Sequence, residues 1–184
     1  MDRRELLKIA AAGLLAGQQS SAQHSHGDGE AAPDLSGYRP RFFSEAEYRA
    51  IGVLCDILAP SDEMSPGARE AGAPYYMDTV LNYAPPHERE FWRAGLRNAD
   101  NAAQSAFDRP FLECDAQQQD NIFAEMAANE RNPQTDLQRF FEPFKQLTVE
   151  AFSLSDIGMH RYLGYYGDTM LTDFPGCTHP EHQR

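Results

Sequence analysis

The sequence predicts an all-α protein. Apolar residues recur at three- and four-residue steps in several stretches, whereas no run alternates between apolar and polar residues over the length of a strand. Two patterns, Ser44-x-x-Glu47 and Asp115-x-x-Gln118, are typical of helix starts because each can form a capping box. We expect one compact helical domain over residues 41–176, which is long enough to bury its own core.

The first helix is expected to begin after Ser44, with Phe43 as a hydrophobic staple, and to end at Pro60. Its spacing predicts one buried face, formed by Tyr48, Ile51, Leu54, Cys55 and Leu58. A helical turn over residues 69–71 follows, and Pro74 can start the next helix. The inner face of that helix is predicted to carry Tyr76, Met77, Val80 and Leu81.

Pro85 and Pro86 end this helix and start another. The apolar stripe of the new helix surrounds Trp92 and Gly95 and consists of Phe91, Leu96, Ala99, Ala103 and Phe107. A helix after Asp115 should bury Ile122, Phe123 and Met126, and a long helix should cover about residues 136–154. Pro143 either kinks that helix or begins a second piece. A short helical pattern spans residues 157–163, and residues 177–184 are expected to form an irregular tail.

Residues 1–22 have the order of a twin-arginine export signal. Arg3 and Arg4 precede Leu6, Leu7 and Lys8, an apolar run over residues 9–15 follows, and small residues at 20–22 offer a cleavage site. The apolar run is too short to span a bilayer, so no direct membrane span is expected from it. This signal carries folded proteins, and it predicts a periplasmic location. Residues 23–40 are small and polar, and we expect a flexible linker there.

The charge of the chain argues against nucleic acid as a partner. The whole chain has a formal net charge of −12, and because residues 1–22 carry +1, the remainder carries −13. Lys145 is its one lysine, and its arginines are scattered among acids, whereas a phosphate-binding surface needs clustered basic residues. For the same reason, anionic membranes are not expected to be direct partners.

The sequence carries none of the usual catalytic motifs, such as a glycine-rich nucleotide loop, a nucleophile elbow, a zinc-binding His-Glu-x-x-His or a haem-attachment Cys-x-x-Cys-His. His87 and His160 are expected to be ordinary histidines, the latter without an adjacent carboxylate partner. Metal ligands are densest in the tail, at Cys177, His179 and His182. Nothing nearby fixes their geometry.

Several motifs resemble one family of small subunits. They comprise residues 43–48 (FSEAEY), 54–62 (LCDILAPSD), 65–73 (SPGAREAGA) and 76–78 (YMD), with weaker likeness at 111–112, 117–119, 140–141, 147–148 and 164–167. Together they resemble the gluconate 2-dehydrogenase subunit 3 (gamma) family of membrane-bound sugar and sugar-acid dehydrogenases. The resemblance implies a subunit without catalytic residues or a cofactor of its own.

The resemblance further implies that, in such complexes, a large flavoprotein of the glucose-methanol-choline oxidoreductase type holds FAD and oxidises the sugar or alcohol. A multihaem cytochrome c takes the electrons. The small subunit carries the export signal for the flavoprotein and supports its maturation. The alternative is a stand-alone exported metal protein or enzyme that uses Cys177, His179 and His182.

Three cysteines reach an oxidising compartment after export and cannot all pair within one chain. Cys55 lies on the apolar face of a predicted helix and is expected to be buried. Cys114 and Cys177 are expected to be accessible, and a disulfide between them would tie the tail to the domain. The other possibility is that one of them bonds to the large subunit.

Overall fold

The computed structural model describes residue 35, residues 37–63 and residues 66–162, and these residues form helices without any strand. The prediction of an all-α domain is therefore confirmed. In chain order the elements are α2 (Glu45–Leu58), α3 (Ala73–Asn82), α4 (Pro86–Phe107), η1 (Phe111–Glu113), α5 (Ala116–Ala127), α6 (Asp136–Leu154) and η2 (Ile157–Tyr162).

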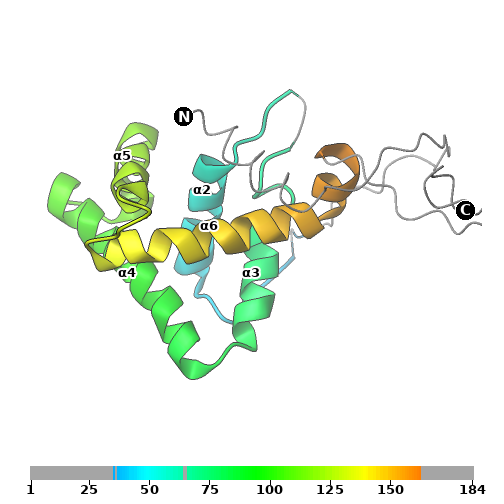
Figure 1. Cartoon of the computed structure of the whole chain (residues 1–184), viewed down its shortest axis with the longest axis horizontal. Coiled ribbons are helices and arrows are strands. Elements are labelled where there is room, and N and C mark those ends of the chain that lie inside the picture. Colours follow the sequence, from blue (N-terminus) through cyan, green and yellow to red (C-terminus); the bar gives the residue numbers. More distant parts are fainter. Residues whose placement is uncertain (1–34, 36, 64–65, 163–184) are drawn as a thin grey trace, which may run out of the picture.

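Helix α6 is the central element of the domain. It packs against α3, α4, α5 and η2, and Figure 1 shows it lying across the V that α3 and α4 form. Its side chains at three- and four-residue spacing face the core, so one long helix buries a continuous apolar stripe. This stripe comprises Leu137, Phe140, Phe141, Phe144, Ala151 and Phe152.

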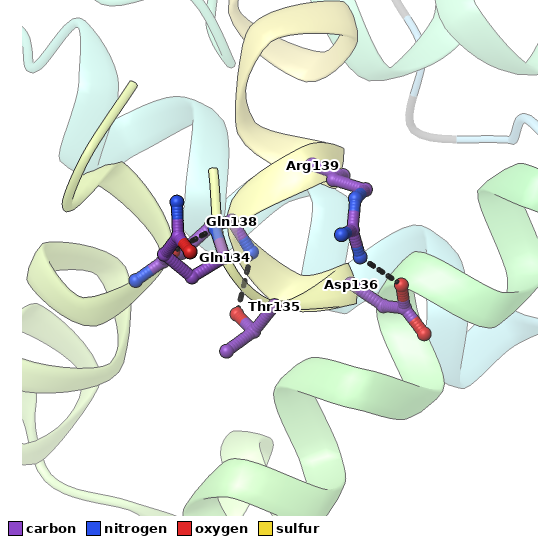
Figure 2. Close-up of polar contacts among 5 residues, drawn as sticks. All are labelled: Gln134, Thr135, Asp136, Gln138 and Arg139. Carbon is purple, nitrogen blue, oxygen red and sulfur yellow. Dashed lines mark hydrogen bonds and ion pairs between the residues drawn. The ribbon is translucent and has the colours of Figure 1, made fainter. Parts of the chain in front are cut away.

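The start of α6 is fixed by polar contacts of its first turn (Figure 2). The backbone N–H of Gln138 donates to the hydroxyl of the N-cap Thr135 (3.2 Å), and the Gln138 side chain accepts from the backbone N–H of Gln134 (2.8 Å). Arg139 and Asp136 form an ion pair (2.6 Å). Two donors at the helix start are thereby satisfied, which sets where the helix begins.

The two predicted capping boxes are confirmed. Ser44 and Glu47 bond reciprocally at the start of α2, and Asp115 and Gln118 do the same at α5. Pro143 lies inside α6, which continues through it as one helix rather than splitting into two pieces. Its missing N–H removes one bond of the helix, but the apolar residues on both sides of it stay in the core.

The centre of the core is aromatic and closely packed. The ring of Trp92 in α4 meets the ring of Phe140 in α6 edge to face, with centroids 5.3 Å apart. Gly95, one turn further along α4, leaves the space that the Phe140 ring fills. Helices α4 and α6 therefore approach closely at this point because one of them lacks a side chain there.

Two predicted helix faces need correction. Val80 in α3 is 39% exposed and Phe91 in α4 is 38% exposed, although both were expected in the core. On α3 the fully buried position is instead Asp78, beside Met77 and Leu81. The stripe of α3 is thus rotated so that a carboxylate, and not Val80, faces the interior.

Candidate functional site

Asp78 is a fully buried carboxylate on α3, and it holds the chain segment that enters the domain. Its Oδ2 accepts from the hydroxyl of Tyr38 (2.6 Å) and the backbone N–H of Arg41 (2.7 Å). Its Oδ1 accepts from the backbone N–H groups of Phe42 (3.0 Å) and Phe43 (2.8 Å). A buried charge is tolerated when it is fully hydrogen-bonded, so these four donors explain why an acid can lie in the core.

We name residues 38–43 the N-terminal strap. Its first residue, Tyr38, packs edge to face on Tyr75 with centroids 4.8 Å apart, and it also contacts the ring of Tyr48 at 5.7 Å. Burial and the hydrogen bond to Asp78 raise the pKa of Tyr38 to about 12, so its hydroxyl stays a neutral donor at ordinary pH. Although residues up to 40 were expected to be linker, Tyr38 is part of the folded domain.

The other side of the strap is held by α4. The guanidinium of Arg93 donates to the carbonyl oxygen of Phe42 (3.1 Å) and lies 4.9 Å from the centre of the Phe42 ring. Arg89 stacks on the same ring at 5.4 Å. The strap is therefore held between a carboxylate of α3 and two cations of α4, through main-chain groups and one ring.

A second feature is the apolar surface that the described residues leave open. Tyr83 is 77% exposed and Leu154 is 60% exposed, which is unusual for side chains of this size. Tyr75 and Leu154 also line a groove of about 200 Å³ between the start of α3 and the end of α6. An apolar groove with exposed side chains at its edge is typical of a surface that binds another molecule.

The described cysteines are both buried. Cys55 lies in the core as expected, with its sulfur 4.0 Å from the hydroxyl oxygen of Thr148, and burial raises its pKa to about 12. The expectation that Cys114 is accessible is wrong, because only 7% of it is exposed and burial raises its pKa. It follows the turn η1, where its N–H bonds to Phe111, and this tight turn packs it inward. Cys177 lies outside the described residues, so the disulfide stays a prediction.

His160 also differs from expectation, because it does have a carboxylate partner. Its Nδ1 lies 2.6 Å from Oδ1 of Asp156, four residues earlier, since the helical turn η2 brings the two side chains together. Among the residues that the structure places, no group of three His, Cys, Asp or Glu side chains could hold a metal ion. The tail candidates Cys177, His179 and His182 lie outside those residues.

The predicted export residues Arg3, Arg4, Leu6, Leu7 and Lys8 also lie outside the described part of the chain. No helix within the described ranges is long and apolar enough to cross a membrane. The main residue that sequence reasoning missed is Asp78. A signal for it exists, because Pro74, Met77, Asp78 and Leu81 have the i, i+3, i+4, i+7 spacing of one helix face.

A family model described as gluconate 2-dehydrogenase subunit 3 matches residues 45–171 of the chain. The chain belongs to this family. The match begins at the first residue of α2 and passes beyond η2, so every helix described above lies within the region typical of gluconate 2-dehydrogenase subunit 3. Comparison with curated proteins and comparison with solved structures each found no match.

Proposed function

We propose that this chain is the non-catalytic small subunit of an exported dehydrogenase complex that oxidises a sugar, sugar acid or alcohol. The observation that carries the proposal is the family match over residues 45–171, which covers the whole helical domain. A family whose members are numbered as a third subunit implies an assembly with other chains. The substrate site is then expected on a larger partner.

The proposed partner is a flavoprotein of the glucose-methanol-choline type, which holds FAD, and a multihaem cytochrome c is the proposed acceptor of its electrons. This chain is proposed to hold no cofactor itself. The open apolar residues on α3 and α6, above all Tyr83 and Leu154, support a role in binding a protein. A large partner would remove these side chains from water, which is the main favourable contribution to most protein association.

We further propose that residues 1–22 export the flavoprotein together with this chain to the periplasm. The twin-arginine route transports folded proteins, so one leader can serve a complex that has already assembled. The N-terminal strap supports this role, because it fixes the point at which the leader leaves the folded domain. The small subunit would then also assist folding or flavin loading of its partner before transport.

Affinity purification tests the proposal directly. The tagged full chain, expressed in its own host, should be recovered from the periplasmic or membrane fraction with a flavoprotein that contains FAD. The flavoprotein expressed alone should be poor in FAD and in sugar-dependent dye reduction. Recovery of the small chain alone would contradict assembly, and full flavin content in the lone flavoprotein would contradict the maturation role.

A further inference from the structure

Arg89 and Arg93 form a pair of cations on one face of α4. They are four residues apart, so their side chains leave the helix on the same side, and both lie over the ring of Phe42. Both residues are half-buried. Two guanidinium groups thus lie over one aromatic ring.

Among the described residues, neither arginine has a carboxylate partner. Arg93 donates to the carbonyl of Phe42, but Arg89 makes no hydrogen bond, and its Nε is buried without an acceptor. The chain has 28 acidic and 16 basic residues, so acidic partners are abundant. Other basic side chains do use them, as in the pairs Arg69–Asp56, Arg97–Glu90, Arg139–Asp136 and Lys145–Glu130.

The nearby carboxylate of Asp78 does not explain the pair. Both of its oxygens are taken by Tyr38 and by backbone N–H groups of the strap, and within the described residues no arginine side chain donates to it. The buried donor of Arg89 is therefore left unsatisfied within the described part of the domain, which is costly for a polar group out of water. Two neighbouring cations also repel each other unless an anion lies between them.

The chemistry of the pair indicates what it binds. A guanidinium is planar and presents parallel N–H donors that match the two oxygens of a carboxylate. At the end of α3 next to α4, Val80 and Tyr83 are exposed. Phe91 is exposed as well, but it lies on the other side of α4, toward Phe140. Arginine together with aromatic residues is the composition typical of the energetically important centre of protein interfaces.

We propose that Arg89 and Arg93 bind an Asp or Glu carboxylate on the surface of the flavoprotein subunit, and that the α3–α4 hairpin is the docking face. This inference rests on the proposed function. Arg89 makes the more important contact, because its terminal N–H groups are not buried and have no acceptor in the described part of this chain, whereas its buried Nε is out of reach of a partner. The carboxylate would accept from Arg89 and Arg93 together, which also removes their mutual repulsion.

The sharpest variant is Arg89→Met. It breaks no hydrogen bond of the described domain and loses only the stacking of the guanidinium on Phe42, so the melting temperature of the isolated subunit should fall by less than about 4 °C. Its Kd for the purified flavoprotein should rise by at least about 30-fold, because a carboxylate on the partner loses its charged donor. Arg89→Lys keeps the charge without the planar fork and should give an intermediate Kd.

The matched control is Arg97→Met on the same helix, which breaks only the exposed pair with Glu90 and should leave the Kd within about twofold of the wild type. A wild-type Kd for Arg89→Met overturns the arginine site and leaves the proposed function intact. Failure of the wild-type subunit to bind the flavoprotein overturns the proposed function, and the inference with it. If Arg89→Met does not fold, the Kd of Arg89→Lys is the test. A wild-type Kd for folded Arg89→Lys then overturns the inference.

Discussion

The ring of Phe140 occupies the position at which a side chain on Gly95 would have to lie. A Cβ built on Gly95 would be 2.2 Å from Cδ2 of Phe140, which is far inside van der Waals contact. Phe140 cannot move away easily, because it is fully buried and its ring also meets that of Trp92. The close approach of α4 and α6 therefore depends on this one glycine.

Gly95→Ala should destabilise the domain by about 1–3 kcal/mol, because overpacking outweighs the gain in helix propensity. Urea unfolding followed by circular dichroism measures the change. Gly52→Ala in α2 is the matched control, since its Cβ would meet only the flexible end of Arg69 at 3.2 Å. That control should be neutral or stabilising, and equal effects of the two substitutions would contradict the tight contact with Phe140.

Asp78→Ala should cost about 3–5 kcal/mol, because it leaves the Tyr38 hydroxyl and three backbone N–H groups without their acceptor. Tyr38→Phe removes one of these four bonds and should cost about 1–2 kcal/mol. Asp56→Ala, which breaks an exposed ion pair with Arg69, is the control and should cost less than about 1 kcal/mol. Urea unfolding ranks the three, and a wild-type midpoint for Asp78→Ala would show that the strap is not held by this carboxylate.

The stability of the domain should fall as the pH rises from about 10 to about 12. Burial raises the pKa of Tyr38 and of Tyr48 to about 12, above the value near 10 of an unfolded tyrosine. In this interval the unfolded chain has lost protons that the folded chain retains, so the free energy of unfolding decreases. Their contribution is complete below about pH 10. Unfolding midpoints across this range test the effect. Tyr38→Phe together with Tyr48→Phe should reduce the decline, and the part due to the buried Cys55, whose pKa is also raised to about 12, should remain.

Replacing Arg3 and Arg4 by lysine should leave the precursor in the cytoplasm. If this chain carries its partner through the export route, the flavoprotein should remain in the cytoplasm as well. Fractionation with blotting for both proteins measures this, and a periplasmic marker that uses another export route serves as the control. Normal export of the flavoprotein beside the double variant would remove the carrier role.

Neither Cys55 nor Cys114 should react with an alkylating reagent in the native protein. Both thiols are buried, and burial raises the pKa of each, so the reactive thiolate is scarce. Mass spectrometry of native and urea-unfolded protein counts the labelled thiols. Rapid native labelling of Cys114 would mean that its site opens readily, as a bond to Cys177 would require. An intact mass of exported protein that is about 2 Da lower without reductant would show that an intrachain disulfide forms, and peptide mapping would identify its two cysteines.

The helix boundaries of this domain could be predicted because they depend on neighbouring residues. The capping boxes at Ser44 and Asp115 are local arrangements, and the apolar spacing of α6 is visible in the sequence without knowledge of its partners. The continuity of α6 through Pro143 could not be predicted. A helix that lacks one hydrogen bond at a proline continues only if the residues on both sides of the proline pack on other helices.

The site was harder to predict, because its contacts join distant segments. In α3 both Tyr76 with Val80 and Met77 with Leu81 offer apolar spacing, so the sequence alone does not decide which face is buried. The N-terminal strap determines which face of α3 is buried, because it brings four hydrogen-bond donors to Asp78. The contacts of Arg89 and Arg93 with Phe42 likewise join residues about fifty positions apart in the sequence. Such contacts cannot be predicted from the spacing of apolar residues within one helix.

The strap also constrains the order of events during synthesis. Tyr38 leaves the ribosome well before Asp78, which follows it by 40 residues. The hydroxyl of Tyr38 therefore cannot bond to the Asp78 carboxylate until that residue has been synthesised. Until α3 exists, nothing in the described chain satisfies the donors at residues 41–43. The place at which the N-terminal extension meets the domain thus becomes fixed only after α3 has formed, and protection of residues 38–43 from a protease would report that the nascent chain has passed this point.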